Sequence, residues 1–294
     1  MNLLFILNPV AGHGKNSALR IIPEIEEYCR DKSINYEIQK TEYRGHATLL
    51  TKTALNSSNS YDAIISVGGD GTLLEVANGL LGSDMSLGLL PAGSGNDFAR
   101  ALGIPSNIGA ALELLNEPKT RLIDVANFQD MFFVNVASVG FDAEIIRDLL
   151  KIKRFIPGRA SYYAAILLKF FTYKFKNISV TLDDLKFKEK IFLLAIANGT
   201  HYGGGMKVNP NGSLDDGYLD VIIINSLPRY KIPFLMTKFI KGKYQDLPFV
   251  KTYRCKKVTV DSLDKLVINA DGDILASTPA TFTARPLALN VIGS

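Results

Sequence analysis

Three glycines, one carboxylate and one hydroxyl lie within five consecutive residues of this chain, at 68–72 (Gly-Gly-Asp-Gly-Thr). An apolar, strand-like run precedes this glycine loop at 61–67, and residues 72–81 have helical spacing. Glycines at such a junction let a phosphate chain approach the backbone, and the first amides of the following helix attract the anion. The sequence therefore predicts a phosphate-binding loop.

Asp70 is the unusual member of this loop, because a carboxylate beside bound phosphates would repel them. A role in holding a cation or in receiving a proton explains its presence better. The same residues also allow an ordinary glycine turn in which Asp70 or Thr72 caps the helix.

Three more polar loops follow strand-like runs, at 8–15 (NPVAGHGK), 40–42 (KTE) and 91–97 (PAGSGND). Ligands of parallel α/β sheets bind at the carboxyl ends of the strands, so all four loops are expected at one site. The first loop is not a Walker A motif, because Pro9 and Asn16 replace residues that this motif requires. The glycine loop is not a GxGxxG dinucleotide fingerprint either. Lys15 is either a phosphate contact or an exposed lysine at a helix start.

The elements that must position these loops alternate along residues 1–126. Strand-like runs lie at 2–7, 35–39, 61–67 and 87–90, and helical stretches lie at 16–31, 45–56, 72–81 and 106–116. Because crossovers between parallel strands are right-handed, this βαβα pattern predicts a doubly wound parallel sheet with helices on both faces.

The pattern changes near residue 125, after which short strands predominate. They are expected at 132–139, 177–182, 191–197, 218–224, 258–262, 266–270 and 280–285, with helical insertions at 160–175 and 228–242. Many short strands with few helices predict a β-rich antiparallel sandwich or barrel. The fold class is therefore α/β with two domains, a parallel-sheet nucleotide domain and a C-terminal β-rich domain.

Two acidic turns stand out in the second half, at 213–218 (SLDDGY) and 269–273 (NADGD). Each contains Asp-Gly, a common signal for a short β-hairpin. Each also carries two carboxylates, which suit a hard cation or proton transfer. The residues alone leave both interpretations open.

Composition and charge restrict the class of protein. The 294 residues are 47% hydrophobic and 21% charged, enough for sizeable cores in two domains. Cys29 and Cys255 are far apart, so neither a disulfide framework nor a cysteine metal site is expected, and a reducing cytoplasm fits. The run at 3–7 is too short for a signal peptide, and no stretch is long enough to span a membrane.

Basic residues are concentrated in the second half of the chain. Residues 1–126 contain 10 Lys/Arg and 14 Asp/Glu, a net charge of −4, whereas residues 127–294 contain 23 and 15, a net charge of +8. This asymmetry indicates an anionic membrane or nucleic acid as a partner, or else simply solvated lysines. The apolar, aromatic stretch at 162–171 has basic flanks and fits a bilayer interface, an acyl-chain slot or a helix packed on the sheet.

Four motifs occur together and in order along the chain. They are Asn8-Pro9-x-Ala11-Gly12-x-Gly14-Lys15, the glycine loop, Pro91-x-Gly93-Ser94-x-Asn96-Asp97-Phe98-Ala99, and Asp271-Gly272-x. In this combination the chain resembles the diacylglycerol kinase catalytic-domain family of lipid kinases, which includes bacterial diacylglycerol kinases and sphingosine kinases. The resemblance covers nearly the whole chain. It implies an ATP-binding domain at 1–126, completed by 286–294, and a lipid-substrate domain at 127–285, with nucleotide and lipid meeting in a cleft.

The resemblance also assigns ligand-binding residues. It places ATP against Asn8, Lys15, Thr41, Gly68, Gly69, Asp70, Gly71, Thr72, Leu73, Leu74, Ser94 and Asn96. It implies that Asp70 acts on the phosphates through Mg²⁺. A structural Mg²⁺ is implied at the first acidic turn, with the Asp216 carboxylate and the carbonyl oxygens of Ser213 and Tyr218 as ligands.

The third residue of the last motif is the family's general base, usually Glu, and here it is Asp273. The side chain is one methylene shorter, which withdraws the carboxylate by about 1.5 Å. Asp271 is the alternative base. The activity implied is transfer of the ATP γ-phosphoryl group to a lipid hydroxyl, most simply diacylglycerol to phosphatidic acid.

Other functions are weighed against this one. The acceptor could instead be a sphingoid base or a polyprenol, and a catalytically silent lipid-binding relative would fit the change at Asp273. NAD kinase is disfavoured because its Ser-Thr-Ala-Tyr segment does not occur, and no nucleic-acid module is recognised. We expect a cytoplasmic protein associated peripherally with an anionic membrane, no nucleic-acid partner, and an oligomeric state that is open, a homodimer included.

Overall fold

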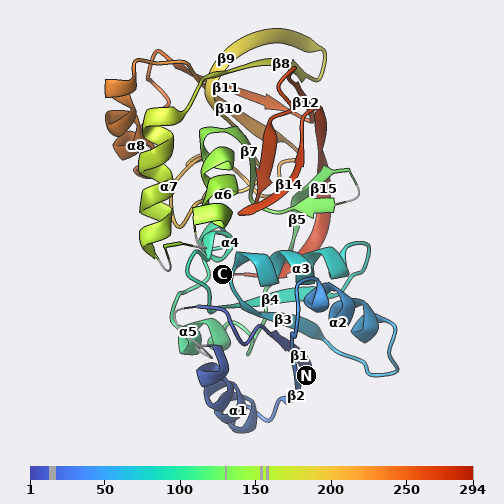
Figure 1. The fold of residues 1–294 in the computed structure, drawn as a ribbon. Helices are drawn as coiled ribbons and strands as arrows, with labels where there is room; N and C mark the ends of the chain where they lie inside the picture. The colour runs from blue at the N-terminus through green and yellow to red at the C-terminus, as the bar shows by residue number, and fades with distance from the viewer. Residues whose placement is uncertain (13–17, 130, 153–154, 157–158, 294) are drawn as a thin grey trace. The chain divides into compact units, whose positions relative to one another are not determined.

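The computed structural model describes residues 1–12, 18–129, 131–152, 155–156 and 159–293 (Figure 1). Lys15 therefore lies outside the described residues. The chain divides into two compact units. Unit 1 consists of Met1–Val125, Gly203–Gly205 and Arg285–Ser294, and unit 2 of Ala126–Tyr202 and Met206–Ala284. Residues 203–205 lie in unit 1, whereas the sequence predicts them in the second domain.

Unit 1 is built on a parallel sheet with the strand order β2-β1-β3-β4, and the end of β15 pairs with β4. The strands are β1 (Asn2–Leu7), β2 (Asn35–Lys40), β3 (Ala63–Gly68), β4 (Ser86–Pro91) and β15 (Ala280–Ile292). The apolar strands β1, β3 and β4 are almost entirely buried, whereas the more polar β2 is partly exposed at the edge. Burial on both faces explains their continuous apolar sequences.

Helices cover both faces of this sheet. They are η1 (Ala18–Ile21), α1 (Ile22–Asp31), α2 (His46–Leu55), α3 (Asp70–Leu80), α4 (Asp97–Ala101) and α5 (Ile108–Glu113). Figure 1 shows α2 and α3 packed together on one face, and α1 and α5 on the other. The predicted doubly wound sheet is confirmed. Helix α3 begins at Asp70, two residues earlier than predicted, and the short α4 was not predicted.

Unit 2 is antiparallel. Its strands are the end of β5 (Thr120–Phe128), β6 (Met131–Phe133), β7 (Val136–Gly140), β8 (Lys176–Leu182), β9 (Leu185–Ala197), β10 (Leu219–Asn225), β11 (Val250–Cys255), β12 (Lys257–Asp261), β13 (Val267–Ala270), β14 (Asp273–Ser277) and the start of β15. One run of pairs is β14-β13-β7-β9-β10-β11, and a second is β9-β8-β12-β15. The long strand β9 therefore belongs to both runs, and the predicted β-rich fold is confirmed.

Two apolar cores lie on opposite faces of β9. Leu194 and Ile196 pack in the core of the β-strands, together with Phe133. Leu193 and Ala195 pack instead in the core beneath the helices. Residues 191–197 are consequently buried without interruption, as a strand covered on both faces requires.

The helices of unit 2 are α6 (Phe141–Ile152), α7 (Arg159–Thr172), η2 (Arg229–Lys231) and α8 (Ile232–Ile240). Helix α6 was not predicted, because it begins directly after Gly140 (φ +120°), the last residue of β7. Among the helices described here, none is both long enough and apolar enough to cross a membrane.

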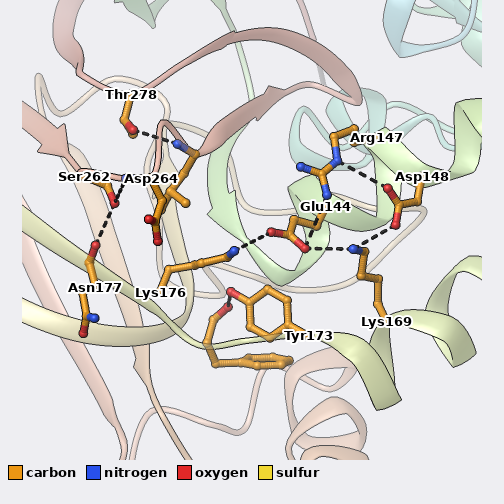
Figure 2. A network of polar contacts seen from close by, with 12 residues as sticks. Glu144, Arg147, Asp148, Lys169, Tyr173, Lys176, Asn177, Ser262, Asp264 and Thr278 are labelled. Atoms are coloured by element: carbon orange, nitrogen blue, oxygen red, sulfur yellow. Dashed lines mark hydrogen bonds and ion pairs between the residues drawn. The ribbon is translucent and has the colours of Figure 1, made fainter.

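Helices α6 and α7 are joined by a nearly buried ion network (Figure 2). Lys169 Nζ lies 2.9 Å from Glu144 Oε2 and 2.8 Å from Asp148 Oδ2, and Lys176 Nζ lies 2.9 Å from Glu144 Oε1. Burial alone would raise the pKa of Glu144, but hydrogen bonds from Lys169 and Lys176 outweigh burial and hold that pKa below its usual range. The network therefore stabilises the ionised carboxylates and fixes α7 on α6.

Replacing Lys169 by Met should lower the free energy of unfolding at pH 7 by about 3 kcal/mol, because two nearly buried carboxylates lose a shared partner. The loss should be measured by urea denaturation. The pKa values of Glu144 and Asp148 are lowered, so the stability they contribute is present above the usual carboxyl pKa and disappears as the pH falls through the lowered values. The difference between variant and wild type should shrink accordingly in acid.

Lys251→Met is the matched control, since Lys251 pairs with Glu189 at 2.6 Å but is 46% exposed. An exposed pair contributes less than about 1 kcal/mol. Equal losses in the free energy of unfolding for the two variants would contradict the stabilising role proposed for the buried network.

Candidate functional site

The glycine loop of unit 1 forms where β3 turns directly into α3. A Cβ atom on Gly68 would lie 2.6 Å from Thr72 Oγ1, and one on Gly69 would lie 3.1 Å from the Cα of Gly93. A side chain at position 68 would therefore clash with Thr72, and position 69 leaves little room for one. The first amides of α3 have no intrahelical acceptors, and they make this end of the helix a site for anions. Residues 71–74 follow in the first turns of α3.

The loop after β1 is tied to the glycine loop. The Asn8 N–H donates to the carbonyl of Val67 (3.0 Å), and Asn8 Nδ2 donates to Thr72 Oγ1 (3.0 Å). Thr41 follows β2 and donates its N–H to the carbonyl of Leu7 (2.9 Å). Asn8, Thr41 and the glycine loop thus lie at the carboxyl edge of the same sheet, where ligands of such folds bind.

The loop after β4 reaches the glycine loop through its backbone. A Cβ atom on Gly93 would lie 2.3 Å from the Cα of Gly69. Asn96 (φ +54°) stabilises this loop, because its Oδ1 accepts the Gly93 N–H (3.0 Å) and its Nδ2 donates to the Gly93 carbonyl (2.9 Å). Asn96 therefore positions the loop, while Ser94 is exposed on it.

Two carboxylates meet beside these loops. Asp70 Oδ1 accepts the N–H of Phe98 at the start of α4 (3.2 Å). A Cβ atom on Gly95 would lie 2.6 Å from Asp70 Oδ2 and 3.7 Å from Asp97 Oδ2, so both carboxylates face this glycine. Burial, followed by the charge of Asp97, raises the pKa of Asp70 despite hydrogen bonds from backbone amides.

This pair fits a hard cation at a phosphate site, because each carboxylate offers oxygen ligands and the two repel each other without one. Among the residues that the structure describes, no three His, Cys, Asp or Glu side chains gather as a metal site. A Mg²⁺ ion here would therefore take its other ligands from phosphate and water, as Mg²⁺ commonly does. Asp97 belongs to the third of the four sequence motifs, but the sequence alone assigns it no role. The signal that was available is a second acidic residue at the same sheet edge.

Asp97 has protein partners of its own. Its Oδ1 lies 3.1 Å from Arg100 Nη1, and its Oδ2 accepts the N–H of Gly204 (2.8 Å). The charge of Asp97 is thus partly compensated. Asp70, in contrast, is held by backbone amides.

The first acidic turn in unit 2 is a bend that leads into β10, and it does not form a hairpin between two strands. Asp216 Oδ1 accepts the N–H of Tyr218 (3.0 Å), and Asp216 Oδ2 is bound by the guanidinium of Arg254. Ser213 lies in the same bend and donates its hydroxyl to Asp215. The three residues implied for a structural Mg²⁺ are together, but a cation there would have to replace Arg254.

The second acidic turn is a two-residue hairpin between β13 and β14. Asp271 (φ +47°) and Gly272 (φ +92°) occupy its centre, as in a type I′ turn. The Asp271 carboxylate accepts the three N–H groups of residues 134–136, at 2.9, 3.1 and 2.9 Å. Asp271 thus connects the hairpin to the start of β7. Asp273 follows as the first residue of β14, half-buried and opposite Ala270.

An apolar cavity of about 250 Å³ lies in unit 2 between the sheet and the helices. It is lined by Phe141, Asp142, Ile145, Ile166, Phe170, Phe192, Leu193, Tyr202, Met206, Ile224, Ile232, Pro233, Leu235, Met236 and Phe239. Asp142 and Tyr202 are the polar residues of this described lining. Burial raises the pKa of Asp142, although hydrogen bonds from Ser138 and Asn269 oppose this. Asp142 was not predicted from the sequence, because a single Asp after a strand forms no pattern.

Comparison with known proteins identifies the class. Residues 2–128 match the diacylglycerol kinase catalytic domain, and residues 135–293 match the YegS C-terminal NAD kinase beta sandwich-like domain. A solved structure of a diacylglycerol kinase from Bacillus anthracis superimposes with a TM-score of 0.79 at 26% identity, covering 100% of this chain and 97% of that one. These matches define a two-domain kinase with an α/β domain followed by a β-rich domain.

Curated relatives give the same result. The chain is 30% identical to a diacylglycerol kinase of Staphylococcus saprophyticus over 94% of its own length and 90% of the relative's. It is 31% identical to a diacylglycerol kinase of Mycobacterium tuberculosis over 98% and 93% of the two lengths. The chain belongs to the diacylglycerol kinase family of lipid kinases.

Replacing Asp70 by Asn should stabilise the metal-free protein at pH 7. The pKa of Asp70 is raised in the folded state, so the stability linked to it is fully present only below the usual carboxyl pKa of about 4 and is lost as the pH rises through the raised value. Removing the charge should raise the melting temperature by about 2–4 °C in a chelator at pH 7.

The difference in melting temperature should vanish in acid, where the wild-type carboxyl is protonated. At pH 7, Mg²⁺ should narrow the difference, because it should stabilise the wild type more than the variant. Asp84→Asn, at an exposed position in unit 1, is the control and should change little. A lower melting temperature for Asp70→Asn at pH 7 would show that the ionised carboxylate stabilises the fold.

Proposed function

We propose that this protein transfers the γ-phosphoryl group of ATP to the hydroxyl of diacylglycerol, forming phosphatidic acid. The observation that carries this proposal is the Asp70–Asp97 carboxylate pair set against the glycine loop, in a chain whose relatives are named diacylglycerol kinases. Phosphoryl transfer requires a loop that binds the phosphates and ligands for a cation that neutralises their charge, and this pair and loop can supply both.

ATP is held through its phosphates. The first amides of α3 bind phosphate oxygens at the glycine loop, and Asn8 and Thr72 fix the two loops that surround them. Asp70 and Asp97 would hold Mg²⁺ there, and the ion would neutralise charge on these oxygens. Positioning and charge neutralisation supply most of the acceleration in this class of reaction.

The acceptor is recognised by its apolar chain. The 250 Å³ cavity of unit 2 is lined almost entirely by aliphatic and aromatic side chains, which suit an acyl chain and offer little to a dinucleotide. This lining favours a lipid acceptor over the NAD of an NAD kinase. Asp142, with its raised pKa, supplies a polar group that can hydrogen-bond the glyceride.

The proton of the lipid hydroxyl passes to Asp273. The hydroxyl oxygen forms a bond to the γ-phosphorus while the bond from that phosphorus to the β–γ bridging oxygen breaks, and ADP leaves. Asp273 is favoured over Asp271 as the base, because Asp271 already accepts three backbone N–H groups. A base needs a lone pair directed at the substrate.

The Asp273 variants test the reaction directly. Asp273→Asn should lower kcat by about 10²–10⁴-fold, the range for loss of a general base, with unchanged ATP affinity. Asp273→Glu keeps the carboxylate and should retain activity. Transfer from labelled ATP should be measured in detergent micelles with short-chain diacylglycerol, sphingosine and undecaprenol, and ATP binding by calorimetry.

Asp271→Asn is the control, because losing acceptors for buried amides should reduce the melting temperature more than ATP affinity. Full activity of Asp273→Asn would remove Asp273 from the mechanism. A higher kcat/KM for sphingosine or undecaprenol than for diacylglycerol would assign a different acceptor.

We also propose that Mg²⁺ binds the bend containing Ser213, Asp216 and Tyr218 by displacing Arg254. Arg254 is 51% exposed, and such an exposed ion pair is worth only about 0–1 kcal/mol, so the exchange costs little. Arg254→Met should therefore raise Mg²⁺ affinity by about threefold or more, as judged from Mg²⁺-dependent melting temperatures.

Asp216→Asn in the same background should remove that gain, because the carboxylate is the charged ligand. If Arg254→Met lowers stability and leaves the Mg²⁺ dependence unchanged, Arg254 is the permanent partner of Asp216 and no cation binds there.

A further inference from the structure

The outer faces of α7 and of the η2–α8 segment present large apolar side chains to solvent. We call this the α7–α8 surface, and it consists of Leu167, Leu168, Phe171, Tyr230, Phe234 and Ile240. Their exposed fractions range from 47% to 77%. The two segments are linked, because Arg229 donates from Nη1 to the carbonyl of Phe171 (2.5 Å) and from Nη2 to the carbonyl of Tyr173 (2.9 Å).

The need to cover the sheet does not explain why these apolar side chains are exposed to solvent. Helix α7 already contributes Ile166 and Phe170 to the apolar cavity, and α8 contributes Leu235 and Met236. A helix that only packs on a sheet needs one apolar face, whereas these helices have apolar residues on the inner and the outer side. Several exposed apolar side chains on adjacent elements indicate a surface that meets an apolar partner.

The charge of the same segments indicates which partner. Residues 159–176 and 226–243 contain nine Lys or Arg and no Asp or Glu. They are Arg159, Lys169, Lys174, Lys176, Arg229, Lys231, Lys238, Lys241 and Lys243. Lys169 and Lys176 are engaged on the inner side by Glu144, as Figure 2 shows. Lys174, Lys231, Lys241 and Lys243 are exposed.

We infer that the α7–α8 surface docks on an anionic lipid bilayer, and this rests on the proposed lipid kinase function. Apolar side chains inserted at the interface and lysines beside anionic headgroups are the two contributions that bind interfacial helices to membranes. A second copy of the chain fits less well, because two such basic surfaces facing each other would repel. The ion network between α6 and α7 fixes α7 from its inner side and leaves the outer face available.

The test is cosedimentation of the whole protein with vesicles that contain neither diacylglycerol nor ATP. The wild type should bind vesicles of phosphatidylglycerol and phosphatidylcholine, and bind vesicles of phosphatidylcholine alone far more weakly. The double variant Leu167→Glu and Phe234→Glu should bind the anionic vesicles at least about tenfold more weakly. Lys241→Gln with Lys243→Gln should weaken binding by about fivefold per lysine and reduce its salt dependence.

Leu185→Glu is the matched control, since Leu185 is 54% exposed at the start of β9, outside the α7–α8 surface, and should leave binding unchanged. Unchanged vesicle binding by the double variant would overturn the proposal. So would a wild type that is dimeric by light scattering and becomes monomeric in the double variant without losing vesicle binding, because the surface would then join two copies.

Phosphoryl transfer from ATP to short-chain diacylglycerol in detergent micelles tests the proposed function without testing membrane docking. The double variant should keep wild-type kcat there, because docking on a bilayer is not needed. A wild type that binds anionic vesicles as expected but phosphorylates no lipid would refute the function and leave the docking surface in place.

Discussion

The backbone contact between Gly69 and Gly93 is the constraint on which the site depends. No side chain fits between them, since a Cβ atom on Gly93 would lie 2.3 Å from the Cα of Gly69. The contact sets how closely the loop after β3 approaches the loop after β4, and so how closely the start of α3 approaches the start of α4. Asp70 and Asp97 stand at those two helix starts. Their mutual approach is therefore determined by backbone packing rather than by side-chain flexibility.

Holding two carboxylates close together destabilises the folded protein, and the two carboxylates are compensated to different extents. Asp97 is paired with Arg100, whereas the raised pKa of Asp70 shows that its ionised form is disfavoured in the folded protein. A group kept charged against its environment is typical of a functional site, where a ligand relieves the strain. A cation held by the two carboxylates would relieve this repulsion, and it would also explain why a carboxylate is tolerated in a phosphate loop.

The parallel sheet could be predicted because β1, β3 and β4 are short apolar runs separated by helical stretches, a local pattern. Helix α6 could not be predicted, since it begins directly after Gly140, the last residue of β7. The first half of β9 alternates exposed lysines with other residues, so only its buried second half was recognised. No local sequence pattern reveals the role of Asp271. Its carboxylate accepts hydrogen bonds from N–H groups that lie 135–137 residues earlier in the chain.

Phe170 and Phe171 show how little of α7 separates the cavity from the outer surface. Phe170 lines the cavity, the next residue is 64% exposed, and the two rings meet edge-on with centroids 5.1 Å apart. An acyl chain in the cavity and a bilayer at the outer face would thus contact consecutive residues. Because Lys169, the residue before them, is fixed by Glu144 and Asp148, this turn of α7 is held in one orientation. The ion network thereby fixes which of the two aromatic rings lines the cavity and which one faces solvent.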